Sequence, residues 1–387
     1  MNKNSADVVV VGGGIVGTAT AHFLAKQGIS CIVVERDGIA SHASGASYAA
    51  LGTFDESGMD GTHFDVASLG MRLHGGLAES LYEDTGINVE FRERPSLSLA
   101  FEEVEAVAAQ EPLGWEQKRR SWEVDRQGYR VEWIGIEEAR RIEPRINPAA
   151  LGAIYMEGTC DVNAQRLTQA LAMSAEQQGA QFKNGTVTGL NKTNGRVRGV
   201  NIGEEEVACE KVVFAMGPWS EGASGWFGTP ILMDPWKGQI LRMRLPGSPI
   251  RSSVGGGDRF ASTKPDGLTW IGPTFEKIGI DETITNAAKE EIITSVSKNI
   301  PTIVEAEVLV HTACIRPLSA DRKLVLGKIP GLEGAYIATG GGRLGLMLGP
   351  AMALLAAELV VQSETTIPIG EFDPARFQEQ KNNLVNG

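Results

Sequence analysis

Three glycines and a following acidic residue form the clearest chemical pattern in the chain. Gly12, Gly14 and Gly17 stand at GxGxxG spacing, and Glu35 follows them. The first glycine permits a tight turn, the second lets the backbone approach a pyrophosphate, and the third lets a helix pack closely on a strand. A helix N-terminus offers amide hydrogens to phosphates, and a carboxylate accepts hydrogen bonds from ribose hydroxyls. The pattern predicts a dinucleotide site made by Gly12, Gly14, Ile15, Val16, Gly17 and Glu35.

The segments around these residues follow the order that such a site needs. Residues 7–11 read DVVVV, which is typical of a strand buried on both faces of a parallel sheet. Apolar residues then recur at helical intervals until Gly28, and a second strand, ISCIVVE, ends at Glu35. This order predicts a Rossmann-type unit. Glycine spacing alone does not separate FAD from NAD.

Composition limits the class of protein. With 387 residues, 42% hydrophobic and 22% charged, the chain is expected to fold into two globular domains. Its net charge of -12 argues against nucleic acid as a partner. Four scattered cysteines favour a reducing cytoplasm, and no spaced His/Cys cluster predicts a metal site. The apolar run before Gly12 is too short for a signal segment, and we expect no membrane span.

A series of motifs runs along almost the whole chain. In order, they are VVVVGGGIVG, EGTCDVNAQRLTQALAMSAEQQGA, VFAMGPWS, PWKGQI, STKPDGLTWIGPT, CIRPLSADRKLVLG and GGGRLGL. Together they resemble the D-amino-acid oxidase family of FAD-dependent oxidoreductases, within it the glycine oxidase and sarcosine oxidase branch. Each is only moderately specific, so their order and spacing carry the resemblance. It implies FAD as the cofactor and oxidation of a small amine that bears a carboxylate.

The cofactor motifs occur at the start, middle and end of the chain, so the FAD-binding domain is expected to be discontinuous. We assign residues 1–88, 151–232 and 311–387 to it, and residues 89–150 and 233–310 to a substrate domain. These inserts contain the strand-like stretches VEFRERPSLSLAF, QILRMRL and LTWIGPT, without phosphate-binding glycine turns. The expected fold is α/β: a Rossmann-type FAD-binding domain and a second domain built on a largely antiparallel sheet.

The resemblance implies further flavin contacts. The segment YIATGGGRLGLMLGPAM is expected to form a strand, a glycine loop and a helix whose start is marked by Pro350. The N-terminus of that helix would stabilise negative charge on reduced flavin. For Val187 and Leu51, core packing is the alternative. The implied contacts are Arg36, Ser44, Ala46, Ser47, Leu51, Val187, Ala215, Gly217, Gly342, Arg343, Leu344, Gly345, Leu346 and Met347.

An amino-acid substrate requires a fixed cation for its carboxylate. The resemblance assigns this role to Arg316, with Arg343 beside the flavin; a structural ion pair is the alternative for each. Phe260 stands where glycine oxidases carry a tyrosine that touches the carboxylate, which favours a larger or more apolar substrate than glycine. Cys314 corresponds to the cysteine that links to flavin in monomeric sarcosine oxidases. Because CIRPLSAD otherwise follows the glycine oxidase pattern, we expect non-covalent FAD.

Two other functions stay open from the sequence. The same carboxylate anchor would accept a 2-hydroxy acid, but that reaction needs a base, and the five histidines offer no convincing candidate. The chain could also be a flavin-binding subunit of a hetero-oligomeric dehydrogenase. The expected partners are therefore a small amino-acid or amine substrate, O2 or another electron acceptor, and further subunits in a homo- or hetero-oligomer.

Overall fold

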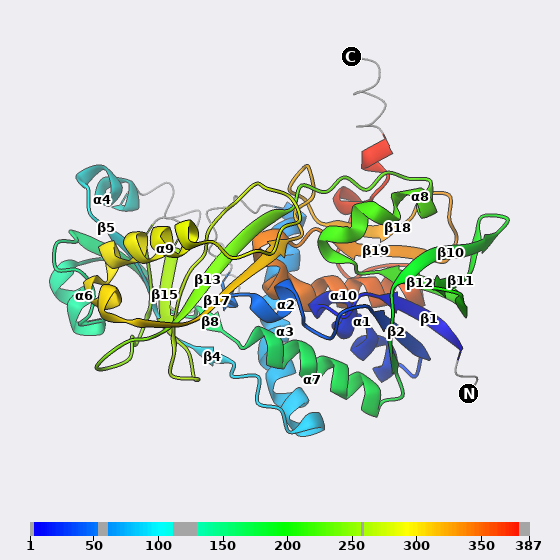
Figure 1. Cartoon of the computed structure of the whole chain (residues 1–387), viewed down its shortest axis with the longest axis horizontal. Coiled ribbons are helices and arrows are strands. Elements are labelled where there is room, and N and C mark those ends of the chain that lie inside the picture. The colour runs from blue at the N-terminus through cyan, green and yellow to red at the C-terminus, as the bar shows by residue number, and fades with distance from the viewer. Residues whose placement is uncertain (1–3, 53–60, 111–129, 257–258, 379–387) are drawn as a thin grey trace, which may run out of the picture.

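Two eight-stranded sheets lie side by side along the long axis of the protein (Figure 1). The computed structural model describes residues 4–52, 61–110, 130–256 and 259–378. The first sheet contains the N-terminal strand and carries the predicted dinucleotide unit. The second is mostly antiparallel and packs against helix α9 (Asn286–Asn299).

The first sheet has a parallel centre extended by antiparallel strands. Its path is β10-β11-β12-β1-β2-β9, with β19 paired to β12 and β18 paired to β19. Pairing is parallel from β9 through β2 and β1 to β12 and on to β19. The bounds are β1 (Ser5–Val11), β2 (Cys31–Glu35), β9 (Gln181–Asn184), β10 (Val187–Thr193), β11 (Arg196–Ile202), β12 (Glu205–Phe214), β18 (Val325–Lys328) and β19 (Ala335–Thr339).

Buried alternate residues of β1 explain how helices cover this sheet. Val8 and Val10 join one core with residues of four helices, while Val9 and Val11 join a second core on the opposite face. Because both faces of β1 are buried, its run of valines reads as continuous rather than alternating. The helices of the first core are α1 (Ile15–Lys26), α3 (Gly61–Thr85), α7 (Ala164–Gln177) and α10 (Gly345–Gln362).

The second sheet follows the order β17-β13-β16-β15-β14-β5-β7-β6. All its pairs are antiparallel except β14 with β5. This confirms the expectation of a largely antiparallel second sheet. The bounds are β5 (Ser96–Ala100), β6 (Val131–Gly135), β7 (Gly152–Met156), β13 (Trp236–Arg244), β14 (Ser253–Gly256), β15 (Arg259–Thr263), β16 (Thr269–Gly272) and β17 (Glu307–Arg316).

Several short elements complete the fold. The helices are α2 (Ala43–Ala46), α4 (Glu103–Gln110), α6 (Ile136–Ile142) and α8 (Ser224–Phe227), and a small sheet contains β3 (Ala50–Leu51), β4 (Arg92–Glu93) and β8 (Cys160–Asp161). Short 3-10 turns span Gly217–Ala223, Pro301–Glu305, Gly342–Leu344 and Gly370–Phe372.

Strand pairing bears on the predicted domain boundaries at residues 151 and 311. All of β7 and all of β17 pair within the antiparallel sheet. However, β7 lies wholly, and β17 partly, in ranges assigned to the FAD-binding domain. We therefore propose boundaries after β7 and after β17. The division of the chain into two domains otherwise stays a prediction.

Helix α10 differs from two expectations. It begins at Gly345, so Pro350 lies inside the helix and does not mark its start. Proline has no N–H to donate to the carbonyl four residues earlier. Here His74 of α3 donates from Nε2 to that carbonyl, Leu346 O, at 3.1 Å, which explains why the helix tolerates Pro350.

The same helix also corrects the expectation that no segment reaches membrane length. The stretch Gly342–Gln362 is long and apolar enough, by length and composition, to cross a membrane. In this fold 72% of its apolar window is buried, and the helix packs against α1 and α3. Its apolar character therefore has a structural explanation in the core of the first sheet.

Candidate active site

A cavity of about 270 Å³ runs from the first sheet to the second. One part is lined by the turn after β1 and by Glu35 at the end of β2, and we call it the glycine end. The other is lined by β13, β17 and the turn before α10, and we call it the arginine end. Predicted residues on its wall are Gly12, Gly14, Ile15, Val16, Glu35, Arg36, Ser44, Ala46, Ser47, Val187, Ala215, Gly217, Arg316, Gly342, Arg343, Gly345 and Leu346.

The glycines shape the glycine end by removing side chains. Gly12 has φ +112°, and a Cβ there would overlap the carbonyl oxygen of Ala215. A Cβ on Gly17 would overlap the carbonyl oxygen of Gly12, so Gly17 permits the turn and α1 to pack closely. At Gly14 a Cβ would meet only the Ser44 hydroxyl, 3.0 Å away. The missing side chain at Gly14 therefore keeps the cavity open, whereas those at Gly12 and Gly17 allow the backbone to pack closely.

Glu35 ties the glycine turn to the strand beside it. Its Oε2 accepts the Gly13 N–H at 2.6 Å, and its Oε1 accepts the N–H groups of Asp37 at 2.8 Å and Gly38 at 3.3 Å. Ser44 Oγ accepts the Ile15 N–H at 2.9 Å, which places this hydroxyl at the N-terminus of α1. Glu35 thus holds the loop through backbone amides. Its hydrogen bonds to a ribose stay a prediction.

Five predicted residues do not line the cavity. Gly17 lies behind the turn, and Leu51, Leu344 and Met347 pack into or against the core that α1 and α10 share. Phe260 lies behind the wall, where it packs against Tyr48, Ile240 and Trp270. Contacts of these residues with FAD or substrate stay predictions. The sequence analysis missed Tyr48 and Ile240, which do line the cavity and carry no recognisable motif.

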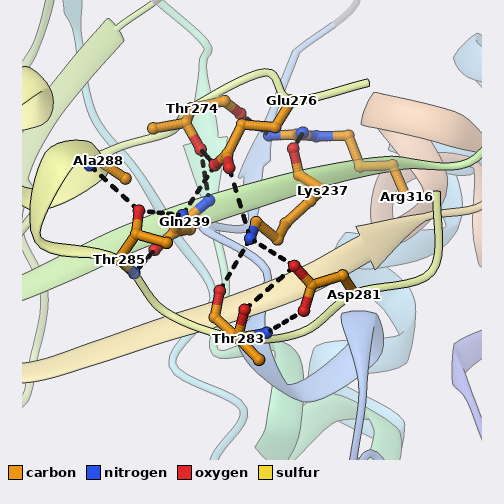
Figure 2. A network of polar contacts seen from close by, with 9 residues as sticks. All are labelled: Lys237, Gln239, Thr274, Glu276, Asp281, Thr283, Thr285, Ala288 and Arg316. Carbon is orange, nitrogen blue, oxygen red and sulfur yellow. Dashed lines mark hydrogen bonds and ion pairs between the residues drawn. The ribbon is translucent and has the colours of Figure 1, made fainter. Parts of the chain in front are cut away.

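Backbone carbonyls hold Arg316 at the arginine end. Its Nη1 donates to Lys237 O at 2.9 Å and its Nη2 donates to Thr274 O at 2.8 Å, as Figure 2 shows. The guanidinium lies across β13 where Gly238 leaves room, because a Cβ on Gly238 would overlap it. The Phe275 ring lies 4.5 Å from Arg316 Cζ. These contacts fix the guanidinium plane and place it on the cavity wall.

A buried polar network fixes the chain that holds Arg316 (Figure 2). Lys237 is 1% exposed, and its Nζ donates to Thr283 O at 2.8 Å and Asp281 Oδ2 at 3.2 Å, with Glu276 Oε2 at 3.4 Å. Gln239 donates to Glu276 Oε1 at 2.8 Å and accepts the Thr285 N–H at 2.9 Å. Two neighbouring β13 side chains thus fasten residues 274–285 to the sheet, and this segment supplies the Thr274 carbonyl and Phe275.

The protonation state of Glu276 agrees with this arrangement. Burial alone would raise the pKa of its carboxyl group, but hydrogen bonds from Thr274 and Gln239 and the charge of Lys237 lower it overall. Glu276 is therefore ionised at neutral pH. A buried cation with charged and carbonyl acceptors around it is a compensated arrangement.

Comparison with known proteins identifies the chain. Residues 7–359 match the family model described as DAO, FAD dependent oxidoreductase. The protein belongs to this family. Glycine oxidase of Pseudomonas aeruginosa is 28% identical over 373 residues, with 96% of this chain and 99% of the relative covered. Glycine oxidase of Geobacillus kaustophilus is 29% identical over 373 residues, with 96% and 97% covered.

Solved structures agree with the fold. The structure of glycine oxidase from Geobacillus kaustophilus has a TM-score of 0.89 at 28% identity and covers 97% of this chain and 99% of that one. Iminodiacetate oxidase from Chelativorans sp. has a TM-score of 0.87 at 22% identity, covering 95% and 98%, which shows the fold alone. These likenesses confirm the predicted family and the α/β fold with a Rossmann-type FAD-binding domain.

The cavity fits the cofactor of this FAD-dependent oxidoreductase. The glycine end has an open glycine turn, the N-terminus of α1 and no capping side chain at Gly14, features that suit a pyrophosphate. The loop before α10 lines the same cavity, with Gly342 at φ +53°. FAD is thus the cofactor that these residues are arranged to hold, and their individual contacts with it remain predictions.

Histidine 42 connects the glycine end of the oxidoreductase with residues 274–285. Its Nε2 lies 2.8 Å from Asp37 Oδ2 and its Nδ1 lies 2.9 Å from Glu282 Oε2, while its ring packs on Trp219. Burial would lower the pKa of His42, but hydrogen bonds to Asp37 and Glu282 raise it overall. No motif marked this residue, because its partner Glu282 is distant in the sequence.

A second charged cluster lies behind Tyr48. The buried carboxylate of Asp161 faces Arg94, Arg92 at 3.1 Å and Lys264 at 3.3 Å. Burial lowers the pKa of Lys264 to about 7, and the two arginines add to this while Asp161 opposes it.

Among the described residues, no group of three or more His, Cys, Asp or Glu could hold a metal ion.

Proposed function

We propose that this oxidoreductase oxidises a small amine that carries a carboxylate, as the names of the glycine oxidase relatives suggest. The observation that carries the proposal is the fixed guanidinium of Arg316 on the cavity wall. A planar fork held by two carbonyls is suited to a carboxylate. Because Arg316 is half-buried and stacked on Phe275, it binds without further ordering.

The reaction needs alignment more than it needs a dedicated acid or base. When bound, FAD supplies an acceptor for the hydride that leaves the carbon next to the amine. The amine also gives up one proton, so the product is an imine, which water hydrolyses to an oxo-acid and ammonia or a primary amine. Arg316 orients the carboxylate, and the apolar wall with Tyr48 and Ile240 excludes water from the reacting carbon.

The side chains on the wall favour an amine over a 2-hydroxy acid. A hydroxy acid requires removal of a hydroxyl proton by a base. His42 lines the cavity, but both of its ring nitrogens contact carboxylates. An amine substrate only has to be bound in its neutral form. The proposal also includes electron transfer to O2 or to another acceptor. It further includes assembly into a homo- or hetero-oligomer and a cytoplasmic location.

Cys314 favours non-covalent FAD. It lies on the cavity wall, and burial raises the pKa of its thiol to about 11. The nucleophilic thiolate is therefore scarce at neutral pH. Acid precipitation of the yellow protein tests this: we expect the colour in the supernatant, and colour retained in the pellet would show a covalent link.

Anaerobic bleaching of the flavin tests the proposed reaction. The purified protein is mixed without oxygen with amino acids, N-methyl amino acids and matched 2-hydroxy acids, and flavin absorbance is followed. We expect bleaching by at least one amino or N-methyl amino acid and none by its hydroxy counterpart. Bleaching by hydroxy acids alone would overturn the proposal. A purified chain that no compound reduces would point to the subunit role.

A further inference from the structure

Two arginines of the cavity wall stack on one aromatic ring. Arg316 Cζ lies 4.5 Å and Arg343 Cζ lies 4.7 Å from the centroid of Phe275. The three residues come from β17, from the turn before α10 and from the segment after β16, so the fold brings distant parts of the chain together. Both arginines line the cavity. A guanidinium on an aromatic face is held in place by cation–π attraction.

The two cations differ in exposure. Arg316 is half-buried and bonded to Lys237 O and Thr274 O, whereas Arg343 is exposed. One positive charge therefore lies on the inner wall and the other nearer to solvent, with the Phe275 ring as a shared support. The protein as a whole has a net charge of -12, which repels anionic ligands. Two cations around one small cavity reverse that repulsion locally.

We propose that Arg343 binds a second acidic group of the substrate, so that the preferred substrates are small amines with two carboxylates. The inference rests on the proposed function, in which Arg316 holds the first carboxylate. A substrate with one carboxylate on each side of its amine offers an acidic group to both cations, whereas a monocarboxylate offers only one.

The exposure of Arg343 limits how strongly this residue can favour a substrate with two carboxylates over one with a single carboxylate. An exposed cation is screened by water and salt, so it discriminates weakly compared with a buried one. We expect the second carboxylate to raise kcat/KM by about fivefold at low ionic strength. Added salt reduces this preference.

A matched pair of substrates tests the inference. Iminodiacetate and its mono-amide have nearly the same shape and differ in one negative charge. For the wild type we expect kcat/KM to favour the diacid by about fivefold, mostly through KM. In Arg343→Gln the ratio should fall close to one. Because the ratio compares two substrates on one enzyme, a general loss of activity or of flavin in the variant cancels.

The chain offers a control for long-range charge effects. Arg322 also stacks on an aromatic ring, Trp236 at 4.6 Å, and pairs with Asp234, but it does not line the cavity. Arg322→Gln removes the same charge outside the cavity. Its diacid preference should remain as in wild type. Equal loss of preference in both variants would overturn a direct contact with Arg343.

A binding measurement removes the dependence on turnover. Diglycolate and methoxyacetate have an ether oxygen in place of the amine and cannot form an imine, and their binding is read from changes in flavin absorbance. We expect tighter binding of diglycolate to wild type and similar binding of both to Arg343→Gln. If wild type oxidises monocarboxylic amines but shows no diacid preference, only this inference fails. If it oxidises neither kind of amine, the proposed function fails.

Discussion

The two ends of the cavity are built from different parts of the chain. At the glycine end, main-chain groups make most of the contacts: Glu35 accepts three backbone N–H groups, and Gly12 and Gly17 allow backbone segments to approach. At the arginine end, side chains support other side chains, since Lys237 and Gln239 fasten the segment that carries Phe275. The main motif of the glycine end, from β1 to Glu35, is local in sequence, whereas the arginine end combines distant segments.

This difference explains how each end responds to change. A backbone site depends on the absence of side chains, so an added side chain can abolish binding altogether. A side-chain site depends on a few functional groups and their supports, so its variants lose activity in steps. The predictions below start with the change that should have the largest effect.

Gly14→Val should abolish or strongly weaken FAD binding. A Cβ at this position meets only the Ser44 side chain, so it does not overlap the backbone, and the valine side chain projects into the space predicted for the pyrophosphate. Flavin content after purification measures the effect. Gly76→Ala in α3 is the control, because a Cβ there meets nothing within 4 Å and alanine favours a helix. Full flavin content in Gly14→Val would show that the pyrophosphate lies elsewhere.

Arg316→Ala should lower kcat/KM by a factor of about a hundred or more while FAD stays bound. Charge-assisted hydrogen bonds of roughly 1.5 to 3 kcal/mol each are lost from a site shielded from water. Arg316→Lys should recover only part, because an ammonium group lacks the planar fork. The decisive comparison is a monocarboxylic amino acid against its amide. A variant that still prefers the acid as strongly as wild type would show that Arg316 has a structural role.

The sequence predicted the glycine end of the cavity better than the arginine end. The Rossmann unit was predictable because valine runs, glycine spacing and helical periodicity are local signals. Arg316 and Arg343 were found only through a family resemblance. Phe275 and the contacts of Lys237 with Asp281 and Glu276 had no signal, because these partners meet only after β13 and the segment after β16 come together. Pro350 was misplaced for the same reason: its compensating partner, His74, is far away in the sequence.

The bond from His74 to Leu346 links α3 to α10 within the apolar core of the first sheet. Burial lowers the pKa of His74 to about 4, so the ring is neutral and donates from Nε2. His74→Leu leaves a buried carbonyl unsatisfied and should lower the free energy of unfolding by about 1 to 3 kcal/mol. Pro350→Ala restores an N–H for that carbonyl. In the double variant the loss should therefore be smaller, as a denaturant titration of all four proteins would show.

The smallest effect should come from His42, where the two ends of the cavity meet. Asp37 and Glu282 face its two nitrogens, and Arg36, paired with Asp37, stacks on the same Trp219. The hydrogen bonds to Asp37 and Glu282 raise the pKa of His42 in the folded protein above its ordinary value. A raised pKa means that the stabilisation is complete below the unfolded pKa of 6.5 and is lost as pH rises through the folded value.

The test compares wild type with His42→Gln, which retains hydrogen-bonding groups but carries no charge. The free energies of unfolding should differ most near pH 6, by less than about 1 kcal/mol because the site is partly exposed, and converge as pH rises above the folded pKa. Hydrogen bonds from His42 and Arg36 lower the pKa of Asp37, so Asp37 stays ionised across this range and the change reports on the imidazole. A difference that stays constant from pH 6 to 9 would mean that shape, not charge, makes His42 a link between the glycine end and residues 274–285.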